Sequence, residues 1–219
     1  MSLIMSQTSG LRLLLMGAPA AFLLMVMSPF SQVYAQEEVY TAELKPVNQQ
    51  VSETAPVGRA EFRLEDDALT ITVTASNLKP DTMYLQHLHG FMNGDDAACA
   101  TPEHDLNNDG IIDIKEAEQV SGMDMIPITD NPVGLEIITD TYPVSSSEGV
   151  IQYSRTVSMS ELKNSVKNRY GVDDLDLEDM VFMLHGVSPD MALPDSVKSA
   201  HGLPPQATLP IACGEIQER

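Results

Sequence analysis

The segment HLHG places two histidines, His87 and His89, one residue apart. Alternate residues of a β-strand point to the same face, so we expect the two imidazoles to lie on one side about 7 Å apart, with Leu88 in the opposite layer. Two imidazoles placed in this way can bind one metal ion, although a single histidine on a strand is more often structural. The pair alone leaves both interpretations open.

Two further histidines stand where a fold could bring them to this pair. His185 ends the apolar segment MVFMLHG, and His104 follows Cys99 by five residues. Three or four imidazoles that converge on one point suit copper or zinc. The fifth histidine, His201, lies in the segment SAHGLPPQ, whose glycine and prolines predict an exposed loop.

A second pattern, DLNNDGIIDIKE at 105–116, matches the twelve-residue calcium loop of EF-hands. The residues that would bind calcium are Asp105, Asn107, Asp109, Asp113 and Glu116 through their side chains and Ile111 through its carbonyl, with Gly110 at the turn. The preceding segment CATPEH contains Pro102 and is too short for an entering helix. We therefore expect a single loop with a dissociation constant on the order of 10⁻⁴ to 10⁻³ M, as in extracellular modules. The alternative is a solvated acidic turn.

The two patterns meet where His104 immediately precedes Asp105. This junction suggests that calcium orders the loop and thereby positions His104 for a transition metal, since groups that orient a metal ligand change affinity by roughly 10–100-fold. Two independent sites, or a His104 that binds nothing, are the alternatives.

The elements that must position these residues are mostly strands. Alternating apolar and polar residues, with turn residues between the segments, predict seven or eight short strands and an antiparallel sandwich or barrel. The segments are 60–64, 69–75, 83–90, 134–139, 150–157, 180–186 and 207–216. One helix is predicted over 158–171, because Ser158 and Glu161 have capping-box spacing and Gly171 is a suitable stop.

The first 35 residues have the composition of a signal peptide. They contain Arg12, no acidic residue and a long apolar stretch, and Val33 and Ala35 fit the small-residue rule for cleavage after Ala35. We therefore predict a secreted or periplasmic protein with a single mature domain over 36–219. An uncleaved membrane anchor is the alternative, although Gly17 and Pro19 interrupt the apolar stretch.

The mature chain carries 11 basic and 32 acidic residues, a formal net charge of −21. Nucleic acid and anionic lipid are poor partners for such a chain and cations are good ones, although part of the acidity can serve solubility alone. The chain has two cysteines, Cys99 and Cys213, and an oxidising compartment favours a disulfide between them.

The histidines and cysteines together resemble the pattern of a known protein family. A His-x-His-Gly motif, a cysteine ten residues after its second histidine, another histidine, a late strand that ends in histidine and a terminal ACGEI together resemble the copper/zinc superoxide dismutases. The early strands also resemble the related chordin-type (CHRD) domains. The resemblance implies a Greek-key β-sandwich and a disulfide between the metal loop and the last strand. By motif order it places the copper ligands at His87, His89, His104 and His185.

The chain departs from that family in two ways. No histidine lies between His104 and His185, so the family's zinc ligands are missing, and Pro210 stands where the family has an arginine that attracts superoxide. A net negative charge also repels an anionic substrate. Copper binding is therefore a stronger inference than dismutation.

Three functions follow from these patterns. They are a copper-binding dismutase-like protein without zinc, a calcium-stabilised extracellular binding module of the CHRD type, and a copper carrier. We assign no catalytic residue, because both cysteines are used in the bridge and no serine stands in a nucleophile motif. The sequence does not predict the oligomeric state.

Overall fold

The computed structural model describes residues 37–52 and 54–219, which belong to one compact unit. The predicted signal peptide and its cleavage point lie outside the described residues. Within the part of the chain that is described, no helix has the length and apolar character needed to cross a bilayer.

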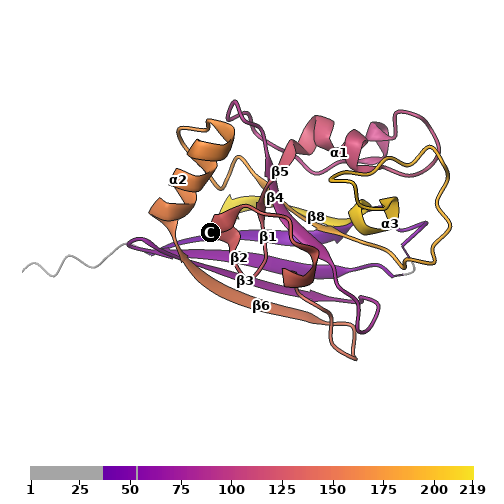
Figure 1. The fold of residues 1–219 in the computed structure, drawn as a ribbon, viewed down its shortest axis with the longest axis horizontal. Coiled ribbons are helices and arrows are strands. Elements are labelled where there is room, and N and C mark those ends of the chain that lie inside the picture. Colours follow the sequence, from indigo (N-terminus) through magenta and orange to yellow (C-terminus); the bar gives the residue numbers. More distant parts are fainter. Residues whose placement is uncertain (1–36, 53) are drawn as a thin grey trace, which may run out of the picture. The chain divides into compact units, whose positions relative to one another are not determined.

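Eight strands in the described residues form one antiparallel sheet in the order β5-β4-β7-β8-β1-β2-β3-β6. The strands are β1 (Glu38–Pro46), β2 (Val57–Glu65), β3 (Ala68–Ser76), β4 (Leu85–Gly90), β5 (Met123–Pro127), β6 (Ile151–Ser158), β7 (Val181–His185) and β8 (Pro210–Glu218). Figure 1 shows β1, β2, β3 and β6 side by side in one layer. Their alternating sequences explain this layer, since one face of each strand is buried.

The sheet curls at β8, which pairs with β1 on one side and with β7 on the other. Buried side chains from the two halves then meet in one core, where Phe62 and Ile71 of the first half pack in the same cluster as Leu88 and Phe182 of the second. The structure therefore confirms the predicted all-β fold, a curled antiparallel sheet that forms a β-sandwich.

In the described part of the chain, three α-helices and three short 3₁₀ helices lie outside the sheet. They are η1 (Pro102–His104), α1 (Ile114–Ser121), η2 (Pro132–Gly134), η3 (Thr139–Thr141), α2 (Met159–Tyr170) and α3 (Pro205–Thr208). The predicted helix is α2, in which the Ser158 hydroxyl accepts a hydrogen bond from the Glu161 amide at 3.1 Å and Gly171 ends the helix with a φ of 78°. Helix α1 begins within the acidic loop at Ile114 and continues the chain beyond it.

One predicted strand is wrong. Segment 134–139 forms no strand, because Leu135 has a left-handed backbone with a φ of 54° and the segment runs between two 3₁₀ helices. A left-handed residue breaks the extended path that a strand requires. Conversely, β1 and β5 are strands that the sequence pattern did not indicate.

Candidate metal centre

Strand β4 positions the first two histidines as its alternation predicts. Leu88 packs into the main core, while His87 and His89 lie on the other face with ring centroids 5.9 Å apart. The pairing of β4 with β5 shifts register between Leu88 and His89. Such an irregularity changes the direction of a side chain, and here it lies at a histidine of the cluster.

Strand β7 brings the third histidine to the same face. Phe182 and Leu184 of β7 enter the main core, and His185 pairs with Leu85 of β4. A second register shift, between Leu184 and His185, occurs where β7 pairs with β8. Both irregularities of this half of the sheet therefore lie next to a histidine.

His87, His89 and His185 converge. One ligand atom from each lies within 4.8 Å of the other two, and the Nε2 atoms of His89 and His185 are 3.2 Å apart. Two nitrogens bound to one zinc ion at 2.0–2.1 Å and a tetrahedral angle lie about 3.3 Å apart. The observed spacing is therefore that of neighbouring ligands of one ion.

The proton positions of His89 and His185 follow from their carbonyl partners. The Nδ1 of His89 lies 3.3 Å from the Gly122 carbonyl and the Nδ1 of His185 lies 3.0 Å from the Thr208 carbonyl. A carbonyl only accepts hydrogen bonds, so both Nδ1 atoms carry the proton and both Nε2 atoms keep a lone pair. This is the arrangement that carbonyl partners impose on metal-binding histidines.

Burial keeps all three rings neutral. The three side chains are at most 3 % exposed, and desolvation lowers the pKa of His87 and His185 well below the usual histidine value and also lowers that of His89. Since neither His89 nor His185 is protonated at neutral pH, their two lone pairs face each other without a proton between them. A cation at this point removes that repulsion.

His87 has one nitrogen with a partner and one without. Its Nε2 lies 2.6 Å from the Tyr142 hydroxyl, whereas its Nδ1 is buried and has no hydrogen-bond partner. If Nε2 donates its proton to the Tyr142 oxygen, Nδ1 keeps a lone pair that a cation can accept. Burial, together with the charge of Asp124, raises the pKa of Tyr142, so the hydroxyl stays protonated. The three rings therefore fit a metal ion by their donor atoms as well as by their spacing.

His104 is not brought to this cluster. It ends η1, where its Nδ1 accepts a hydrogen bond from the Thr101 amide at 3.0 Å. The structure thus gathers three of the four histidines that motif order suggested, and the coupling through His104 has no geometric support. His201 is exposed, as its sequence context predicts, and it also lines the cavity beside the three rings.

Residues 105–116 form a loop whose side chains bond to its own backbone. Asp105 accepts from the Gly110 amide at 2.8 Å, and Glu116 reaches back to accept from the Leu106 amide at 2.9 Å. Asp113 caps α1 by accepting from the Lys115 amide at 2.8 Å. Among the described residues, no three carboxylates of this loop lie close enough together to form a ready cation site.

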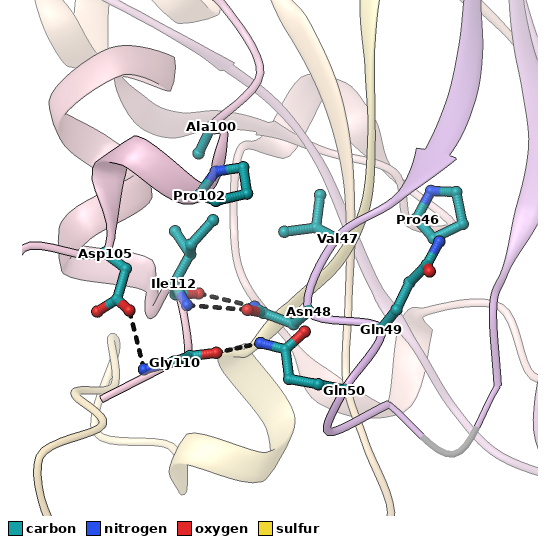
Figure 2. A pocket seen from close by; sticks show the side chains of 10 residues that line it. All are labelled: Pro46, Val47, Asn48, Gln49, Gln50, Ala100, Pro102, Asp105, Gly110 and Ile112. Atoms are coloured by element: carbon teal, nitrogen blue, oxygen red, sulfur yellow. Dashed lines mark hydrogen bonds between the residues drawn. The ribbon is translucent and has the colours of Figure 1, made fainter. Parts of the chain in front are cut away.

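A cavity of about 410 Å³ is lined by residues of this loop and of the segment that follows β1. Figure 2 shows the link beside it: the Asn48 side chain donates to the Ile112 carbonyl and accepts from the Ile112 amide, both at 2.8 Å. Asn48 also donates to the Pro210 carbonyl at 2.9 Å, and Gln50 donates to the Gly110 carbonyl. The loop is therefore fixed to the segment that follows β1, and Asn48 of that segment is fixed to the start of β8.

The predicted disulfide is confirmed: Cys99 and Cys213 are bonded, with Cα atoms 5.8 Å apart. It joins the segment after β4 to β8 over a separation of 114 residues. In the chain-entropy model, a bridge over such a loop contributes roughly 4–5 kcal/mol to stability.

Comparison of the chain with protein-family models finds no match, and neither does comparison with curated proteins. Among solved structures, the chain is similar to a SOD-like protein from Bacillus subtilis, with 15% sequence identity and a TM-score of 0.40. The similarity covers 80% of this chain and 96% of that one.

Proposed function

We propose that this protein binds a copper ion at His87, His89 and His185. The observation that supports the proposal is the pair of facing Nε2 atoms, 3.2 Å apart, each belonging to a buried imidazole whose Nδ1 proton is held by a carbonyl. Copper is preferred to zinc because Cu(II) is the strongest divalent binder at a given nitrogen site and imidazole suits it.

The residues around the rings have separate tasks. The carbonyls of Gly122 and Thr208 fix two rings and Tyr142 fixes the third. Leu85 and Ile114 line the cavity and keep bulk water away. When bound, copper supplies one-electron chemistry.

The cavity favours holding the ion over turning over a substrate. It measures about 10 Å³, room for roughly one water-sized species, and its lining contains no lysine or arginine. The sequence order of the ligands and the confirmed disulfide support superoxide dismutation as the second candidate. Superoxide turnover by the copper-loaded protein, measured beside the free ion at equal concentration, separates the two.

We also propose that loop 105–116 binds calcium. Its support is the complete ligand pattern, together with a nearly buried Glu116 that folds back to the start of the loop. Calcium would act through α1, which follows the loop directly, carries Ile114 into the metal cavity and ends just before Gly122. A calcium-stabilised extracellular module without copper is the remaining alternative.

The export that the sequence predicts fits a chain whose two cysteines form a disulfide, since such bonds persist in oxidising compartments. We propose a secreted or periplasmic location. Protease accessibility of the protein in intact cells tests it.

Elemental analysis and a Cu(II) titration of the purified 36–219 protein test the main proposal. We expect one copper per chain with nitrogen ligands. The proposal would be contradicted if the copper affinity of the wild-type protein were no higher than that of the His89→Gln variant.

A further inference from the structure

One carboxylate lies in the wall of the histidine cavity. Asp124 of β5 pairs across the sheet with His89, and its side chain is 6% exposed. It is the one acidic residue among those that line the cavity. A charged group so deeply buried is costly unless another charge or a polar partner compensates it.

His201 lies on the solvent side of this carboxylate, at ion-pair distance from an oxygen that has no hydrogen-bond partner among the described residues. Its Nε2 lies 2.7 Å from Asp124 Oδ2, while its side chain is 37% exposed. His201 therefore stands between the buried carboxylate and solvent, at the mouth of the cavity.

The segment that carries His201 is held in place. The Lys198 amide donates to Asp113 Oδ2 at 2.7 Å, and the Ser196 hydroxyl bonds to Asp109. Ala200, next to His201, is 7% exposed and lines the same cavity. His201 is thus positioned by the acidic loop.

The charge of a bound metal ion suggests a role for Asp124 and His201. Three neutral imidazoles leave the full charge of a bound divalent cation in a buried site, and a neighbouring carboxylate offsets part of it. We propose that Asp124 is the counter-charge of the metal centre and that His201 is the positioning residue that holds its carboxylate. This inference rests on the proposed copper site, and it assigns His201 to a centre where motif order suggested His104.

The pair must then favour the more highly charged ion. A fixed negative charge stabilises Cu(II) more than Cu(I), because the coulombic interaction scales with the charge of the ion. Loss of the Asp124 charge should lower Cu(II) affinity by about 10–100-fold, the range for groups around metal ligands. The Cu(I) affinity should fall less, so the reduction potential of the bound copper should rise. A merely structural defect would lower the Cu(II) and Cu(I) affinities by the same factor.

The test compares four variants of the 36–219 protein. Asp124→Asn keeps the shape and removes the charge, with Asp174→Asn, a carboxylate whose side chain is 94% exposed, as the matched control. His201→Ala removes the partner, and His201→Gln keeps an N–H donor. Competition titrations with Cu(II) and Cu(I) chelators, and the potential of the loaded protein, are the readouts.

We expect Asp124→Asn to lose Cu(II) affinity selectively, His201→Ala to lose about 3–10-fold, and His201→Gln to recover most of that loss. Equal losses for both copper ions, or no loss in His201→Ala, would overturn the inference. If Asp124→Asn does not fold, the comparison of His201→Ala with His201→Gln tests the inference by itself. Wild-type protein that binds no copper would instead refute the proposed function, so the two failures are distinguishable.

Discussion

The histidine cluster and the acidic loop are built in opposite ways. The cluster stands on paired strands, and the Nε2 atoms of His89 and His185 already face each other while backbone carbonyls hold the protons on their Nδ1 atoms. In the loop, the carboxylate oxygens of Asp105 and Glu116 already accept hydrogen bonds from backbone amides. A nitrogen site on a sheet can thus be preformed, whereas an oxygen site in a loop must exchange bonds when an ion enters.

This difference predicts which site depends on single side chains. Rigid strands leave no substitute for a lost imidazole. A loop with many oxygens can redistribute its ligands, and it contributes mainly to stability.

Removal of one imidazole should have the largest effect. Structural zinc sites with four ligands are worth about 10–16 kcal/mol, which is several kcal/mol per ligand. His89→Gln or His185→Gln should therefore lower copper affinity by about 100- to 1,000-fold in a competition titration. His104→Gln is the matched control, and a similar loss there would show that the three-histidine site is incomplete.

Acid should destabilise the metal-free protein through the same rings. The folded-state pKa values of His87, His89 and His185 lie below the unfolded value near 6.5, so the unfolded chain binds protons first as the pH falls. Their contribution is complete above pH 6.5 and is lost below it, at about 1.4 kcal/mol per pH unit for each ring that protonates only on unfolding.

Urea unfolding between pH 8 and pH 5 in the presence of a chelator measures this loss. The His185→Gln variant should show a smaller slope below pH 6.5. An identical slope in both proteins would mean that His185 is not held neutral in the fold.

Calcium should act more weakly, as a stabiliser. With a dissociation constant of 10⁻⁴ to 10⁻³ M, 10 mM calcium adds about 1.4–2.7 kcal/mol to the free energy of unfolding. Asp105→Asn should abolish this increment while magnesium at equal concentration gives little. An unchanged increment in Asp105→Asn would place the calcium effect elsewhere.

Tyr142→Phe should give the smallest change. It removes the hydroxyl that bonds His87 Nε2, and one such hydrogen bond is worth about 1 kcal/mol, or roughly fivefold in copper affinity. The control is Tyr153→Phe, which removes a buried hydroxyl bonded to the Thr129 carbonyl. Equal effects of the two variants would indicate a general loss of stability.

Local patterns in the sequence were enough for much of the fold and for part of the site. The two-residue period of HLHG places His87 and His89 on one face, and the same period in β7 places His185 on the face of Val181 and Met183. Two cysteines allow one intramolecular pairing, which is the one observed. These features depend on neighbours along the chain or on simple counting.

The rest depends on contacts between distant segments. The register shifts at His89 and His185 have no signature in the apolar pattern. Tyr142 and His201 reach the cavity from loops whose paths are set by packing. His104 was assigned by motif order, and in the structure it lies in η1, outside the cluster of His87, His89 and His185. Leu135 is apolar enough for a strand, but its left-handed backbone prevents one.

Electron paramagnetic resonance of the Cu(II)-loaded 36–219 protein tests whether His87, His89 and His185 bind one copper ion. We expect hyperfine coupling to three imidazole nitrogens, with one nitrogen lost in His89→Gln and none lost in His104→Gln. A spectrum dominated by oxygen ligands, or one that His89→Gln leaves unchanged, would contradict it.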